Sequence, residues 1–135
     1  MTNRVVFDTN VLVSAALFRK SVSGQAFEKA ILDGDVLFSK DTRAELVEVL
    51  DRPKFDKYLT KSERLQFISL FVEAAIMVEV TETITDCRDP KDNKFLELAV
   101  SGNATHIVSG DDDLLALQPF RGITILQPQA FLTTE

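Results

Sequence analysis

Four acidic residues, spread along the whole chain, have the type and placement that could bind a metal ion: Asp8, Glu45, Asp92 and Asp111. Each comes shortly after a segment with a strand-like pattern, so each is expected near the end of a strand. Carboxylates about 4 Å apart repel one another by roughly 4 kcal/mol at an effective dielectric constant near 20. A cluster of four therefore either raises the pKa of its members or binds a cation.

The ligand chemistry indicates which cation this is. Carboxylate ligands alone suit a hard divalent ion, and we expect one or two Mg²⁺ or Mn²⁺ ions. The single cysteine, Cys87, excludes both a thiolate zinc site and an internal disulfide. The reaction that such a site favours is hydrolysis of a phosphodiester by metal-activated water, with a second ion stabilising the leaving oxygen.

The segments that must position these acids alternate between strand-like and helix-like patterns. Strands are predicted at 4–7, 36–38, 77–80, 106–108 and 123–126. Helices are predicted at 11–18, 25–32, 42–50, 61–78, 90–100 and 114–117. The helix at 61–78 carries the clearest apolar stripe of one buried face. Strands that are apolar throughout and separated by helices predict an α/β fold, with a parallel sheet covered on both faces.

In such sheets the functional crevice lies outside the carboxyl ends of the strands. Asp8 directly follows the first strand, and Asp111, with Asp112 and Asp113, follows the fourth. Glu45 and Asp92 are expected in the first turns of the helices that follow the second and third strands. Four elements would then deliver carboxylates to the same edge of the sheet. His106 begins a strand and is expected at the opposite edge, which argues against a general base.

Each acid except Asp8 also has a purely structural interpretation. Thr42 to Glu45 has the spacing of a capping box. Asp89 and Asp92 fit an N-cap and an N3 acid around a proline at N1. Residues 111–113 could be a solvated turn favoured by a helix dipole.

Two polar residues beside the acids leave alternatives open. Asn10 either orients a ligand or caps the following helix, and Ser109 has the same two interpretations. Asp8 differs from them, because a lone acid after a buried strand lacks an evident structural reason.

The formal net charge of −6 bears on the choice of substrate. Proteins that bind nucleic acid through a basic face usually carry net positive charge. Setting aside the four acids brings −6 to −2, so the acidity is consistent with a metal site. Candidates for RNA contact flank Asp92: Arg88, Lys91 and Lys94. The basic stretch from Arg52 to Arg64 fits a solvated surface better.

Length and composition predict a single domain over residues 1–135, with 45% hydrophobic and 27% charged residues. The first residues lack the pattern of a signal sequence. The apolar runs fall far below the roughly 18 residues that a membrane span needs. We therefore expect a cytoplasmic protein that makes no membrane contact.

Four segments together resemble the PIN domain family, in particular the VapC-like toxins of bacterial toxin–antitoxin pairs. They are VVFDTNVLVSA at 5–15, TRAELVEVL at 42–50, DPKDNKFLELA at 89–99 and HIVSGDDDLLAL at 106–117. The opening D-x-N is weak by itself, whereas all four in this order are quite specific. The resemblance extends over essentially the whole chain.

The resemblance implies a three-layer α/β/α sandwich with a central parallel sheet of about five strands. It also implies Mg²⁺- or Mn²⁺-dependent cleavage of single-stranded or structured RNA, a homodimer, and a small antitoxin partner that occludes the site. By position, the acidic quartet is Asp8, Glu45, Asp92 and Asp111, supported by Asn10 and Ser109. Asp113 competes with Asp111 for the fourth place, and Asp89 has no assigned role.

Two other functions stay open at this point. A receiver-type phospho-acceptor domain also has a doubly wound sheet and clustered acids. It requires an acidic pair after the first strand and a lysine after the last, where this chain has Asp8-Thr9-Asn10 and Gln127-Pro128. A haloacid-type phosphatase would need D-x-D, which Asp8-Thr9-Asn10 lacks. A PIN fold that serves as a binding partner with weak catalysis is the other alternative.

Overall fold

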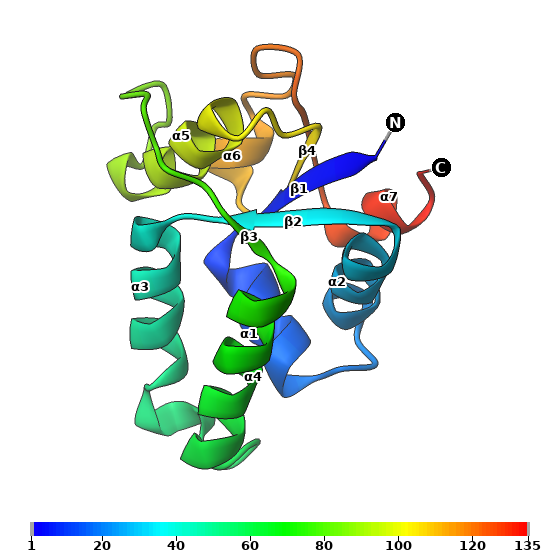
Figure 1. The fold of residues 1–135 in the computed structure, drawn as a ribbon, viewed down its shortest axis with the longest axis vertical. Coiled ribbons are helices and arrows are strands. Elements are labelled where there is room, and N and C mark those ends of the chain that lie inside the picture. Colours follow the sequence, from blue (N-terminus) through cyan, green and yellow to red (C-terminus); the bar gives the residue numbers. More distant parts are fainter. Residues whose placement is uncertain (1, 135) are drawn as a thin grey trace.

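A five-stranded parallel sheet forms the centre of the molecule in the computed structural model, which describes residues 2–134 (Figure 1). Its strands are β1 (Asn3–Phe7), β2 (Gly34–Phe38), β3 (Ile76–Met77), β4 (His106–Val108) and β5 (Thr124–Leu126). They lie in the order β3-β2-β1-β4-β5, and every neighbouring pair is parallel. The prediction of a parallel α/β sheet is confirmed.

Helices cover both faces of this sheet (Figure 1). They are α1 (Thr9–Leu17), α2 (Val22–Asp33), α3 (Lys40–Leu50), α4 (Lys61–Ala74), α5 (Asn93–Ser101), α6 (Asp112–Leu115) and α7 (Pro128–Leu132). Two 3₁₀ turns, η1 (Pro53–Phe55) and η2 (Pro90–Asp92), lie between them in the chain. The three-layer sandwich is therefore also confirmed.

Alternation along β1 divides the apolar side chains between two cores. Val5 and Phe7 belong to the core that also contains buried side chains of α1, α2, α3 and α4. Val6 points to the other face and belongs with Ile107 to the core of α5 and α6. All four of these side chains are almost completely buried, as expected for strands covered on both faces.

The third strand differs from its prediction, because α4 ends at Ala74 and β3 occupies only Ile76–Met77. Ala75 already has an extended backbone, and its N–H donates to the carbonyl of Phe71 at 2.9 Å. Val78 packs against the core on the other side of the sheet from α4. Val78 is therefore apolar because it packs on the opposite face of the sheet. Its position also fits the helical spacing, which is why the sequence predicted a helix as far as residue 78.

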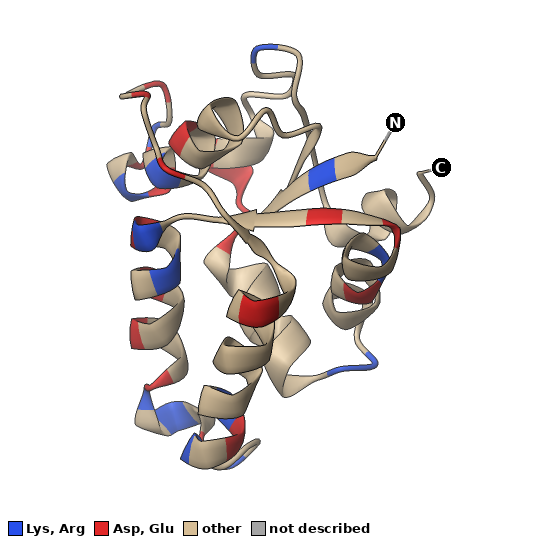
Figure 2. Ribbon diagram, viewed as in Figure 1, with Lys and Arg blue, Asp and Glu red and all other residues tan. Residues whose placement is uncertain are grey.

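The order of the strands places the ends of β1 and β4 side by side. The backbone N–H of Asp8 donates to the carbonyl of Val108 at 3.1 Å, which extends this pairing beyond the strands. Figure 2 shows acidic segments where β1 leads into α1 and where β4 leads into α6. Within residues 2–134, none of the helices is both long and apolar enough to cross a membrane.

Candidate active site

Asp8 is a buried carboxylate at the junction of β1 and α1. It is 5% exposed, and one of its oxygens accepts a hydrogen bond from the backbone N–H of Val11 at 2.9 Å. Burial raises the pKa of Asp8, and repulsion from Asp111 adds to this, although the hydrogen bonds from Ser109 and Val11 act against it. Asp8 is thus also the N-cap of α1, a structural role that its sequence context had not suggested.

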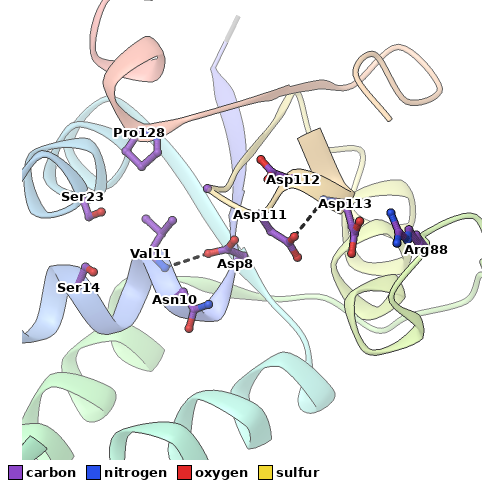
Figure 3. Close-up of a pocket in the computed structure, with 11 residues that line it drawn as sticks. Asp8, Asn10, Val11, Ser14, Ser23, Arg88, Asp111, Asp112, Asp113 and Pro128 are labelled. Carbon is purple, nitrogen blue, oxygen red and sulfur yellow. Dashed lines mark hydrogen bonds between the residues drawn. The ribbon is translucent and has the colours of Figure 1, made fainter. Parts of the chain in front are cut away.

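Because Asp8 caps α1, the alternative in which Asn10 caps this helix is wrong. Asn10 is exposed, and its side chain lines a surface cleft beside Asp8 (Figure 3). Of the two predicted roles of Asn10, only the orientation of a ligand therefore remains.

Ser109 connects the ends of β1 and β4. It is completely buried, and its hydroxyl donates to the second carboxylate oxygen of Asp8. The same hydroxyl oxygen accepts a hydrogen bond from the backbone N–H of Asp111 at 2.9 Å. Ser109 therefore fixes the side chain of one predicted metal ligand relative to the backbone of another.

Asp111 is the N-cap of α6, and its carboxylate accepts from the N–H of Asp113 at 3.0 Å. A hydrogen bond with the carboxyl of Asp92 lowers the pKa of Asp111, and the Asp113 amide lowers it further. The side chain of Asp113 lines the same cleft as Asp8 and Asp111 (Figure 3).

Asp92 lies at the junction of η2 and α5, with its carboxyl against that of Asp111. Burial and the neighbouring Asp111 raise the pKa of Asp92 to about 7, and Asp89 and Asp8 add smaller repulsions. Two carboxyls can form a hydrogen bond only when one holds a proton. With a pKa of about 7, the Asp92 carboxyl supplies that proton in part of the molecules at neutral pH. Asp89 caps η2 through the N–H of Lys91, as its structural interpretation predicted.

The capping box predicted for Thr42 and Glu45 is wrong. Helix α3 begins at Lys40, and its capping box joins Ser39 to Thr42. Each of these side-chain oxygens accepts from the other residue's N–H, at 3.2 Å and 2.9 Å. Glu45 consequently lies in the second turn of α3 and not in the first.

Glu45 has two polar partners, both beside the acid cluster. The hydroxyl of Thr9, the residue after Asp8, donates to one oxygen of Glu45, and the ammonium of Lys94 pairs with the other. The side chains of Lys94 and Glu45 are only 23% and 24% exposed. Lys94, predicted to contact RNA, is thus the ion-pair partner of an acid in this structure.

A cleft of about 950 Å³ opens over these residues (Figure 3). Its charged lining comprises Asp8, Arg88, Asp111, Asp112 and Asp113. Glu45 and Asp92 do not line it; Glu45 contacts the residue next to Asp8, and the carboxyl of Asp92 lies next to that of Asp111. The predicted quartet is thus adjacent to one cleft, but only two of its members face it.

Comparison with known proteins identifies the family. The model of the PIN domain matches residues 4–113, a span that contains β1 except for its first residue, β2 to β4, and all four predicted acids. The chain belongs to the PIN domain family. An uncharacterized protein of Methanocaldococcus jannaschii is 30% identical over 117 residues, which cover 85% of this chain and 75% of the relative.

The fold of this PIN domain is also found in a solved structure. The crystal structure of VapBC2 from Rickettsia felis, bound to a DNA fragment from their promoter, contains a chain that matches with a TM-score of 0.61 at 13% identity. The match covers 90% of this chain and 96% of the other, and at this identity it shows the fold alone. The receiver alternative is wrong, because flavodoxin-like sheets have the order 2-1-3-4-5 and this PIN domain has 3-2-1-4-5.

The acids of this PIN domain fit a hard divalent cation by their chemistry. Asp8, Asp92 and Asp111 supply carboxylates, and the raised pKa values of Asp8 and Asp92 show that their charges are under-compensated. Within residues 2–134, no three His, Cys, Asp or Glu side chains already form a metal-binding group. Asp92 would have to lose the proton that its raised pKa favours before it could bind an ion.

Sequence reasoning overlooked three hydroxyl residues around this site. Thr9 contacts Glu45, and Ser14 and Ser23 line the cleft at the end away from Asp113 (Figure 3). Thr9 lies inside the D-T-N motif and could have been found there. Ser14 follows Asn10 by one helical turn, which is a weak signal, and Ser23 comes from a separate helix.

Proposed function

We propose that this PIN domain is a Mg²⁺- or Mn²⁺-dependent endoribonuclease that hydrolyses phosphodiester bonds of single-stranded RNA. The observation that supports it most is the convergence of Asp8, Asp92 and Asp111 from three separate elements, with the pKa of Asp92 raised to about 7. Perturbed carboxyls beside a cleft are typical of functional sites.

Each acid has a distinct part in this proposal. Asp8, Glu45, Asp92 and Asp111 would hold the ion, with Asp113 at the cleft surface as the alternative to Asp111. Ser109 keeps the Asp8 carboxylate oriented, and Thr9 and Lys94 hold Glu45 next to it. The bound ion would activate a water for attack and neutralise the charge that develops on the phosphate.

Water is the nucleophile in this proposal, because the cleft offers no activated side chain. In the described part of the chain, its lining contains neither cysteine, histidine nor lysine. Within residues 2–134, the hydroxyls of Ser14 and Ser23 have no hydrogen bond to a base that could remove their protons. We therefore expect no covalent intermediate with the protein.

In this proposal, Arg88 binds a phosphate of the RNA. It is the basic residue in the described cleft lining, and it is exposed at the acidic end (Figure 3). A guanidinium suits two-point contact with a phosphate. Lys91 is exposed and outside the lining, so its contribution to RNA binding should be smaller and less dependent on position.

We also propose that the protein is the toxin of a toxin–antitoxin pair, that it forms a homodimer, and that a small antitoxin covers the cleft. The support is the shared fold with VapBC2, which is seen bound to its promoter DNA. Large exposed apolar side chains are available for protein contacts: Leu32, Leu65, Leu70 and Met77. Light scattering of the purified protein should give twice the mass of one chain; a monomer at micromolar concentration would contradict the dimer.

The test of the enzymatic proposal is cleavage of a panel of single-stranded and hairpin RNAs by purified protein. We expect cleavage with Mg²⁺ or Mn²⁺ and none with EDTA. Asp8→Asn, purified in parallel, controls for contaminating nuclease and should be inactive. Equal cleavage by the wild type and Asp8→Asn would assign the activity to a contaminant. Absence of cleavage with intact metal binding would favour a PIN fold that acts as a binding partner.

A further inference from the structure

The half of the cleft away from Asp113 has a different chemistry from the acidic half. It is formed by Asn10, Val11 and Ser14 of α1, Ser23 of α2 and Pro128 of α7, and we call it the uncharged arm (Figure 3). Asn10 and Ser14 are four residues apart and therefore share one face of α1. Val11 lies between the halves, since its N–H binds Asp8.

The polar groups of the uncharged arm have no partner elsewhere in the protein. Within residues 2–134, the hydroxyls of Ser14 and Ser23 and the amide of Asn10 make no hydrogen bond. The capping serines differ, because the hydroxyl of Ser21 accepts from the N–H of Gly24 at 3.1 Å and Ser39 caps α3. Ser14 and Ser23 thus lack the capping role of Ser21 and Ser39. Ser62 and Ser69 of α4 also make no hydrogen bond within residues 2–134, but they are exposed, whereas Ser14 and Ser23 are half-buried in a cleft.

Ser23 is held in place by a close backbone contact. A Cβ added at Gly24 would lie 2.2 Å from the carbonyl oxygen of Arg19, so only glycine allows the first turn of α2 to pack against the preceding loop. Ser21 holds the same turn through its hydrogen bonds to Gly24 and to the carbonyl of Phe18, at 2.6 Å. The hydroxyl of Ser23 is therefore presented to the cleft from a fixed backbone.

The composition of the arm indicates its ligand. Its residues carry no charge, which disfavours a phosphate, and none is aromatic, so a stacking platform for a base is absent from the described lining. Hydroxyl and amide groups both donate and accept hydrogen bonds, as do the hydroxyls of a sugar. Because the arm continues into the acidic half, its ligand would be covalently next to the phosphate at Asp8.

We propose that the uncharged arm binds the ribose of the nucleotide attached to the scissile phosphate, with Ser14 and Ser23 contacting its hydroxyls. The 2′-hydroxyl is the group by which a protein distinguishes RNA from DNA at a given position. A site built to hydrogen-bond a hydroxyl rejects the analogue that lacks it, since its own polar groups are then left unpaired. The position of the scissile phosphate in this inference rests on the proposed function. The binding of a nucleoside to the uncharged arm does not.

The experiment uses uncharged nucleosides, which the acids do not repel, and EDTA to exclude metal effects. The wild-type protein is titrated with the four ribonucleosides and their 2′-deoxy counterparts, followed by amide NMR. We expect shifts of the amides of Asn10, Ser14 and Ser23, with binding about tenfold weaker for the deoxynucleosides. The double variant Ser14→Ala/Ser23→Ala should weaken ribonucleoside binding by about tenfold or more.

Ser62→Ala/Ser69→Ala, on the exposed face of α4, is the matched control and should bind as the wild type does. Alanine is a better helix former than serine, so loss of fold is not expected in either variant, and unchanged amide spectra elsewhere verify this. Shifts outside the arm, equal binding of ribo- and deoxynucleosides, or no effect of Ser14→Ala/Ser23→Ala would overturn the inference. Binding of ribonucleosides to the arm without cleavage of RNA would contradict the proposed nuclease function but would support the ribose site.

Discussion

Two buried charged side chains, Asp8 at the end of β1 and Arg64 in α4, lie in opposite electrostatic surroundings. Arg64 is 2% exposed, and its guanidinium donates to the carboxylate of Asp56 at 2.7 Å and to the carbonyl of Leu59 at 2.6 Å. Asp8 is 5% exposed, and the charged group that shifts its pKa is another acid, Asp111. Arg64 has an oppositely charged partner, although its Nε–H has no hydrogen-bond partner within residues 2–134, whereas Asp8 has hydrogen bonds but no oppositely charged partner.

The difference separates a charge that supports the fold from a charge to which we assign a function. Burying an ion costs free energy that an oppositely charged partner and hydrogen bonds offset, as at Arg64. At Asp8 and Asp92 burial and like charges instead raise the pKa values, which costs stability; the proposed cation would relieve this repulsion. The following predictions test this contrast.

The largest effect is expected on activity. Asp92→Asn or Asp111→Asn should lower kcat for RNA by about a thousandfold or more, because loss of a ligand misplaces the ion and the attacking water. The melting temperature in EDTA should not fall, since each change removes a like charge. Single-turnover cleavage with Mn²⁺ measures the first quantity, and calorimetry measures the second. A variant that keeps wild-type kcat would remove its residue from the predicted ligands.

The opposite outcome is expected at Arg64. Arg64→Met should lower the free energy of unfolding by about 2–3 kcal/mol, because it removes the ion pair between the buried guanidinium and the exposed Asp56 and leaves the Leu59 carbonyl without its donor. Activity per folded molecule should be unchanged. Urea denaturation and RNA cleavage at low temperature check both parts. The control is Arg52→Met, at an exposed ion pair, which should change stability by less than about 1 kcal/mol. Similar losses in both variants would contradict the assigned role of Arg64.

A smaller effect is expected on the pH dependence of stability without metal. The pKa of Asp92 is about 7 in the folded protein and near 3.8 in the unfolded chain, so the folded state binds the proton more tightly. This contribution is fully present below about pH 4 and is lost as the pH rises through 7. The lowered pKa of Asp111 makes stability rise with pH instead, but this change falls at more acidic pH than the loss due to Asp92.

Asp92→Asn should therefore flatten the stability profile between pH 5 and 8. At pH 8, Asp92→Asn should have a higher free energy of unfolding than the wild type. Because Asp92 is partly exposed, solvent screening reduces this difference to about 1 kcal/mol, or roughly 3 °C in melting temperature. Thermal unfolding in EDTA measures the profile. A profile of Asp92→Asn parallel to that of the wild type would show that Asp92 does not carry the pH dependence.

The smallest effect is expected at Lys94. Lys94→Met removes the cation paired with Glu45 and should tighten Mn²⁺ binding by about two- to fivefold, because the acid is then free of competition. Lys91→Met, which removes an exposed charge of the same kind, is the control and should change Mn²⁺ affinity less. Weaker Mn²⁺ binding in Lys94→Met would instead mean that the ion pair holds Glu45 in its binding position.

Much of the fold follows from local patterns. The apolar strands, the parallel sheet and most helices were predicted because burial on both faces leaves a continuous apolar run, as in β1 and β4. The end of α4 was not predicted, since Val78 continues the helical period while packing on the other core. Helix α7 was missed because its five residues contain too little periodicity.

The site was predictable where it depends on strand order. Acids after β1 and β4 meet because these strands are neighbours, so Asp8, Ser109 and Asp111 were found together. The rotamers of Glu45 and Lys94 were not predictable, because the sequence does not show that α3 and α5 bring them into contact. The uncharged arm was missed for the same reason, since Ser23 approaches α1 only through the packing of α2.

The most direct test of the central claim is the stabilisation of the folded protein by Mn²⁺. At a hundredfold excess over Kd, binding to the folded state should raise the free energy of unfolding of the wild type by about 2.7 kcal/mol, or roughly 8 °C. Asp8→Asn should lose most of this gain, and Asp33→Asn, at an exposed acid away from the cleft, should retain it. An equal Mn²⁺ shift in wild type and Asp8→Asn would place the ion elsewhere and contradict the account.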